Sequence, residues 1–158
     1  MATITKNRLP QARQFSAPYG NLFADSFRFA VNSSGVALDS NGASAVAVND
    51  VVRIGILQAG LSIHDATLAI SDAFAASTTA DIGFAYVDGV DSTDVPQDAD
   101  YFFAAQSTAT AARARMATAV APVRLPKDAY VILTRKGAAD SAAGVLDLIV
   151  SGVQEGSA

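Results

Sequence analysis

The sequence predicts an all-β protein: an antiparallel β-sandwich or jelly roll of about eight strands with an extended N-terminal arm. Short segments in which apolar and polar residues alternate recur along the chain, which is the pattern of half-buried strands. Clusters of Gly, Pro, Asn, Asp and Ser separate these segments at the spacing of turns. No segment repeats with a period of 20–50 residues, so a solenoid or a propeller is excluded.

At 158 residues the chain fits a single domain that can bury a real core. We expect residues 1–21 to form the arm and residues 22–158 to form the β-sandwich domain. Pro10 and Pro18 interrupt any regular helix in the arm and favour extended backbone. Such an arm gains little by lying on its own domain and is suited to wrapping a partner.

The first strand of the domain is predicted within residues 22–31. Phe27, Phe29 and Val31 fall on one face there, and polar or small residues fall on the other. Apolar β-branched segments bounded by turn residues mark the remaining strands. The other predicted strands are 51–57, 61–71, 80–87, 115–123, 130–135 and 144–151.

Five expectations concern the connections and the pairing of strands. The Asn41–Gly42 pair is a strong hairpin signal, and segment 32–49 is either an outward loop or an extra hairpin. Residues 88–100 are expected to form a loop rich in Asp, and residues 101–106 a short helix. The strands between residues 51 and 87 are expected to pair consecutively as antiparallel neighbours.

The residues needed for common active sites are scarce. Without cysteine, the chain can form no disulfide, thiolate zinc site or cysteine nucleophile. The one histidine, His64, is expected on a strand surface, whereas a cupin-type metal site needs several imidazoles. The sequence also lacks a Gly-x-Ser-x-Gly elbow and the phosphate-binding motifs. We therefore predict a non-enzymatic protein with no catalytic residue, no cofactor and no metal site.

Five aspartates gather in the loop at residues 88–100, and their oxygens offer a calcium site as an alternative. Their spacing does not match an EF-hand loop, and no Glu is present for bidentate closure. A solvated, self-repelling loop is therefore favoured, and a basic partner or neighbouring subunit can dock there. The five are Asp88, Asp91, Asp94, Asp98 and Asp100.

Charge is divided unevenly along the chain. Residues 1–24 carry three cations and no acid, whereas the rest has a net charge of −7. An acidic body argues against direct binding of nucleic acid, which needs clustered Lys and Arg. A basic arm instead suits docking onto an acidic protein surface, although three incidental cations at a frayed terminus are the simpler alternative. The predicted partner-binding residues are Lys6, Arg8, Arg13, Phe15 and Tyr19.

Nothing in the sequence indicates a membrane protein. No apolar run approaches the roughly 20 residues that cross a bilayer, and the first residues lack the apolar stretch of a secretory signal. We expect a soluble protein made in the cytoplasm.

Two pairs of segments resemble a known family. They are 65–74 (DATLAISDAF) with 80–91 (ADIGFAYVDGVD), and 125–134 (LPKDAYVILT) with 144–150 (GVLDLIV). Their order, together with an arm that begins MATITK, resembles the small jelly-roll cement (decoration) proteins of tailed double-stranded DNA phages. The resemblance covers residues 1–6 and 50–154 and is one of pattern, not of an invariant motif.

The resemblance implies a homotrimer on the outer capsid surface of the virion. Such trimers clamp neighbouring subunits of the major capsid protein and resist the pressure of packaged DNA. The resemblance implies no catalytic residue, and segment 32–49 departs from the family pattern. The alternative is a tail or other surface module that binds carbohydrate or protein, although the chain has no Trp for sugar stacking.

Overall fold

The computed structural model describes residues 1–7, 22–117 and 119–154, and within them every regular element is a β-strand. The all-β prediction is therefore confirmed. The strands are β1 (Thr3–Thr5), β2 (Leu22–Val31), β3 (Val51–Leu57), β4 (Leu61–Asp72), β5 (Thr79–Tyr86), β6 (Asp98–Ser107), β7 (Ala112–Arg115), β8 (Val123–Arg124), β9 (Ala129–Lys136) and β10 (Gly144–Gln154).

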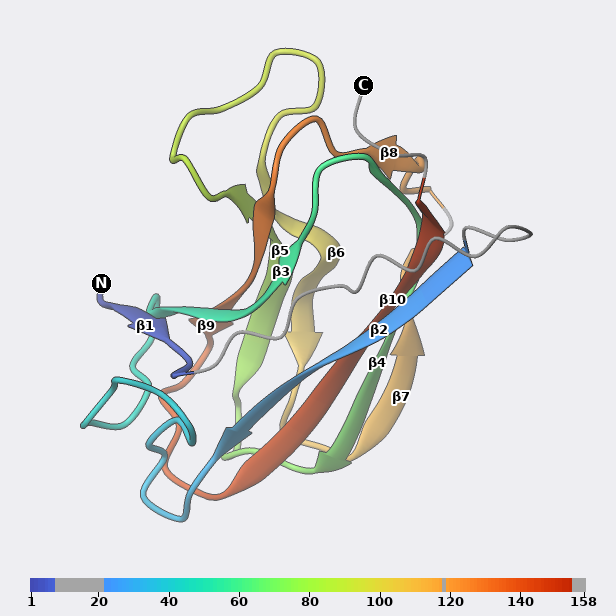
Figure 1. Ribbon diagram of the computed structural model, residues 1–158. Coiled ribbons are helices and arrows are strands. Elements are labelled where there is room, and N and C mark those ends of the chain that lie inside the picture. The colour runs from blue at the N-terminus through green and yellow to red at the C-terminus, as the bar shows by residue number, and fades with distance from the viewer. Residues whose placement is uncertain (8–21, 118, 155–158) are drawn as a thin grey trace.

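Two sheets face each other across the core (Figure 1). One has the order β1-β3-β9-β5-β6, and the other has the order β2-β10-β4-β7, with the short β8 paired to β4. Apart from β1 and β8, each sheet holds four strands joined by antiparallel pairs. This two-sheet arrangement is that of a jelly roll.

The prediction that strands between residues 51 and 87 pair consecutively is wrong. β3 and β5 lie in one sheet with β9 between them, whereas β4 lies in the other sheet. The chain crosses between the sheets at the β3–β4 and β4–β5 connections, and the apolar faces of the two sheets bury each other across the sandwich.

The face of β2 predicted from alternation is confirmed. Phe27, Phe29 and Val31 are buried, and the intervening Arg28 is exposed. The ring of Phe27 lies over Gly55 of β3, where a Cβ atom would come within 2.0 Å of the phenylalanine Cδ1. A glycine at this position therefore lets the two sheets approach each other.

Two local predictions are wrong. Residues 101–106 belong to β6 and not to a helix, because pairing with β5 satisfies their backbone groups. The strand predicted at 115–123 is instead two short strands, β7 and β8, that both pair with β4. The chain leaves the sheet between them, where Met116 turns inward and is buried.

Segment 32–49 is an irregular connection held by isolated bridges, so the predicted hairpin at Asn41–Gly42 does not form. The segment runs beside β1 (cyan in Figure 1). Gly35, near the start of the segment, has a φ of 75°, a backbone conformation that favours glycine.

Candidate functional site

The first seven residues lie against the body of the domain. β1 pairs in parallel with β3, and Ile4 is buried in the core. On the other side of β1, the Thr5 amide donates to the Asn41 Oδ1 at 2.9 Å and the Asn41 amide donates back to the Thr5 carbonyl at 3.0 Å. The Asn7 amide donates to the Asp39 carbonyl at 2.6 Å. Hydrogen bonds from segment 32–49 thus hold β1 at the edge of the sheet.

Of the predicted partner-binding residues, Lys6 is described by the structure. Its Nζ donates a hydrogen bond to the Arg28 carbonyl of β2 at 2.9 Å, and its amide donates to the Arg53 carbonyl of β3 at 3.4 Å. Lys6 therefore ties the two sheets together at their open edge. The other predicted residues lie outside the described part of the chain: Arg8, Arg13, Phe15 and Tyr19.

The acidic loop between β5 and β6 is ordered by its own carboxylates. Asp91 Oδ1 accepts a hydrogen bond from the Gln97 amide at 2.7 Å. Hydrogen bonds from the Val90 amide and from the Lys127 ammonium hold the pKa of Asp88 below its ordinary value. Among the described residues, no group of three or more acidic or histidine side chains is placed to hold a metal ion.

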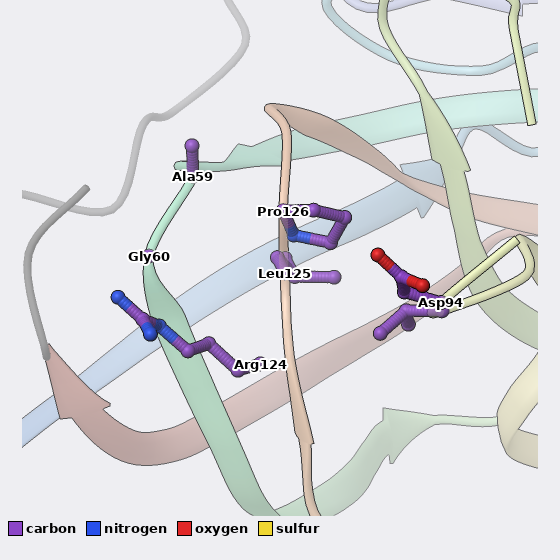
Figure 2. A pocket seen from close by; sticks show the side chains of 7 residues that line it. Ala59, Gly60, Asp94, Arg124, Leu125 and Pro126 are labelled. Carbon is purple, nitrogen blue, oxygen red and sulfur yellow. The ribbon is translucent and has the colours of Figure 1, made fainter. Parts of the chain in front are cut away.

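Two adjoining pockets open beside this loop. The larger, of about 420 Å³, lies between residues 94–98 and the segment that leads from β7 into β8. The smaller, of about 310 Å³, is bounded by Gly60, Arg124 and Pro126. Asp94 lines both pockets. In Figure 2 the Arg124 side chain points away from Asp94, on the other side of the backbone at Leu125.

The single histidine takes part in a local contact. His64 is exposed on β4, and its Nε2 lies 3.3 Å from the Oγ of Ser62. The neighbouring Asp65 is engaged by Arg115 of β7 at 2.8 Å. Within the described part of the chain, no carboxylate is hydrogen-bonded to the histidine, as a serine–histidine–aspartate triad would require.

The most deeply buried ionisable groups form a pair at the opposite end of the sandwich. Arg135 of β9 and Asp140 of the following turn are fully buried, and the Arg135 Nε donates to the Asp140 Oδ2 at 3.1 Å. The guanidinium also lies 4.8 Å from the centre of the Phe74 ring and 5.7 Å from that of Phe29. A planar cation between a carboxylate and two rings is a stable arrangement in an apolar setting.

A chain of hydroxyl groups extends this pair. Arg135 Nη1 donates to the Thr108 Oγ1 at 2.8 Å, Thr108 donates to the Thr78 Oγ1 at 2.8 Å, and Thr78 donates to the Ala75 carbonyl at 2.7 Å. The network joins β9 to the connections before β5 and after β6. Its side chains are buried and bond to one another, so we assign the network to stability.

Burial raises the pKa of Asp140 to about 6, against the lowering influence of the Arg135 guanidinium. The buried Asp140 Oδ1 has no hydrogen-bond donor among the described residues, which adds to the cost of its ionised form. Burial likewise lowers the pKa of Arg135.

We expect the Asp140 carboxyl to titrate near pH 6 in the folded protein, in an NMR titration of its side-chain carbon. An unfolded aspartate has a pKa of about 3.9, so between about pH 4 and pH 6 the folded state holds more protons at this site. The contribution of Asp140 to the free energy of unfolding therefore falls as the pH rises through that window. A titration midpoint at or below pH 4 would contradict this.

Sequence reasoning missed both the buried pair and the larger pocket. Arg135 carried a usable signal, because it ends a predicted strand that is otherwise apolar. The pocket carried no such signal, because Val95 lies in the β5–β6 loop and Val120 and Val123 lie just before and within β8, so their meeting depends on the fold.

No protein-family model and no curated protein matches the sequence. Solved structures do match. A chain from the capsid of Ralstonia phage GP4 is similar with a TM-score of 0.65 and 16% identity, over 99% of this chain and 100% of that one. A chain from the cyanophage Pam1 capsid asymmetric unit is similar with a TM-score of 0.58 and 17% identity, over 89% and 93%. This chain therefore shares the fold of both proteins along most of its length.

Proposed function

We propose that this chain is a non-enzymatic structural protein of a phage virion: a cement or decoration protein. It binds the outer capsid surface as a homotrimer and stabilises contacts between subunits of the major capsid protein. One observation carries the proposal. The two similar structures are phage capsid chains, and the likeness to the GP4 chain runs from end to end of both proteins.

The charge distribution supports docking onto protein and argues against direct contact with DNA. The body carries most of the acidic residues, whereas residues 1–24 carry a charge of +3. A basic segment is attracted to an acidic partner surface, whereas the acidic body is repelled by the phosphates of DNA. Such a distribution favours a place on the outside of the shell, away from the packaged DNA.

A trimer suits this role because it binds several capsid subunits at once. Each added contact forms at high effective concentration, so the combined affinity exceeds that of one contact by orders of magnitude. Weak individual contacts, spread over three copies, then hold neighbouring capsid subunits together.

The decisive experiment mixes the purified protein with empty shells assembled from the major capsid protein of the same phage. We expect co-sedimentation, trimeric density on the outer surface by cryo-microscopy, and shells that withstand higher temperature. Absence of the protein from the shells would overturn the proposal. Micromolar binding to a glycan in its place would favour the tail or surface-module alternative.

A four-residue variant tests the basic segment. We expect loss of shell binding when Arg8 and Arg13 are changed to Gln and Phe15 and Tyr19 to Ser. Substitution is preferable to deleting residues 1–20, because deletion would also remove β1 and expose the edge of β3. The measurement is the fraction that sediments with shells.

The matched control changes two cations on the exposed edge strand β7, Arg113→Gln with Arg115→Gln. It should bind shells as the unchanged protein does, because an exposed ion pair such as that of Arg115 contributes little to stability. If the four-residue variant decorates shells with unchanged affinity, these residues do not bind the partner.

A further inference from the structure

The larger pocket offers apolar surface that the chain itself leaves uncovered. Val95, Val120 and Val123 line it, and each is only partly buried against the core. Phe84 and Tyr101 also line it, and their rings meet edge to face with centres 5.4 Å apart. Three partly exposed valines beside two aromatic rings form a surface that can cover an aliphatic chain.

The rim of this pocket is negative, and no lysine or arginine of the described chain lines it. Asp94 and Asp98 both line it. The Asp94 carboxylate makes no hydrogen bond or ion pair with a described residue, and Arg124 points away from it (Figure 2). The nearby cation Lys127 is already held by Asp88, at 3.0 Å.

The negative charge of the rim affects the groups around it. The pKa of Asp100 is raised because its carboxyl shares a hydrogen bond with that of Asp98, is partly desolvated, and lies near the charges of Asp98 and Asp81. Burial, and then the charge of Asp98, raises the pKa of Tyr101 to about 12. A cation placed at the rim would relieve this repulsion.

We propose that the pocket is a docking socket for an arginine side chain, presented by the capsid-shell partner of this protein. The inference rests on the proposed function for the source of the arginine. Its methylene groups would cover the valines, and its guanidinium would face Asp94 and Asp98. Arginine suits the socket because its guanidinium is weakly hydrated and bonds carboxylates through a fixed fork of donors.

The socket is already organised in the free protein. The Tyr86 hydroxyl donates to the Val95 carbonyl, and the Tyr101 hydroxyl donates to the Ala121 carbonyl at 2.9 Å. These bonds fix the two connections that form its walls. A preformed site loses little conformational entropy on binding, which favours affinity from a small contact area.

The first test needs no shell. The ¹⁵N-labelled protein is titrated with acetyl-Ala-Arg-Ala-amide and, separately, with the same peptide carrying citrulline, which has the shape of arginine without its charge. We expect saturable changes in the NMR chemical shifts of the Val95, Val120 and Val123 amides with the arginine peptide and none with the citrulline peptide. Equal chemical-shift changes with both peptides, or no change with either, would contradict the proposal that the pocket binds arginine.

The second test removes the charge of the rim. Asp94→Asn with Asp98→Asn keeps the acceptor that the Asp100 amide uses, and we expect it to weaken binding of the arginine peptide about tenfold or more. Asp72→Asn, an exposed change at the far end of β4, is the control and should bind as the unchanged protein does. Thermal unfolding of each variant shows that the fold is kept.

The third test uses shells and separates this inference from the proposed function. If the unchanged protein fails to bind shells, the cement role fails while the peptide titration still decides the chemistry of the socket. If it binds shells and the double variant binds equally well, the socket is not the docking point. If the double variant still binds shells but no longer self-associates, the pocket binds a second copy of this chain and not the capsid-shell partner, which would contradict the proposal.

Discussion

Arg135→Met is expected to lower the free energy of unfolding by about 3–5 kcal/mol at pH 7. The side chain of Arg135 is fully buried, and its loss leaves Asp140 buried without a counter-charge. It also removes the donor to the Thr108 hydroxyl. Urea unfolding followed by circular dichroism measures the change, and the aggregation state is checked at each protein concentration.

The double variant Arg135→Met with Asp140→Leu separates the cost of a broken pair from the value of the pair itself. Buried ion pairs are often replaced by apolar residues at little or no cost. We therefore expect it to recover most of the stability lost in the single variant. Thr108 still has Thr78 as a hydrogen-bond partner there. A double variant as unstable as Arg135→Met would show that Arg135 acts through its ring and hydroxyl contacts instead.

Phe27→Ala is expected to cost a similar amount, about 3–5 kcal/mol, for a different reason. The Phe27 side chain is fully buried between the sheets and lies over Gly55. Truncation removes apolar burial and leaves a cavity, and the backbone hydrogen bonds that hold each sheet rigid limit how far the sheets can move to close it. The free energy of unfolding from a urea titration reports the loss.

The control on the same strand is Leu22→Ala. Leu22 is 81% exposed, so we expect a change within about 0.5 kcal/mol. Gly55→Ala adds a second check, because its methyl group would collide with the ring of Phe27 but fill part of the cavity in Phe27→Ala. Gly55→Ala should therefore lower the free energy of unfolding when made alone, and lower it less when combined with Phe27→Ala. Additive losses in the free energy of unfolding would contradict a direct contact between Gly55 and the Phe27 ring.

The strands that the sequence predicts correctly are those whose pattern is local. β3 has the predicted bounds, and Phe27, Phe29 and Val31 of β2 occupy the predicted face. Alternation over several residues depends only on the period of a strand and on which face is buried. Pairing partners depend on the whole chain, so the crossing of β3, β4 and β5 between sheets could not be predicted from neighbouring residues.

β6 shows where local reasoning fails. Tyr101, Phe102 and Phe103 are all buried, which no alternating strand would produce. Phe84 of β5 pairs with Asp98 of β6, whereas Ile82 of β5 pairs with Phe103. An advance of two residues along β5 thus matches five along β6, so the intervening β6 residues bulge from the ladder. The bulge packs against Gly83, where a Cβ atom would collide with the Asp98 carbonyl. Long-range pairing and a missing side chain override a weak local preference here.

The pairing of β1 with β3 has a mechanical consequence for the first seven residues. β1 bonds to β3 in one sheet, and the Lys6 Nζ donates to the Arg28 carbonyl in the other sheet. Tension applied to the chain at residue 7 would therefore be shared by both sheets and not carried by one strand alone.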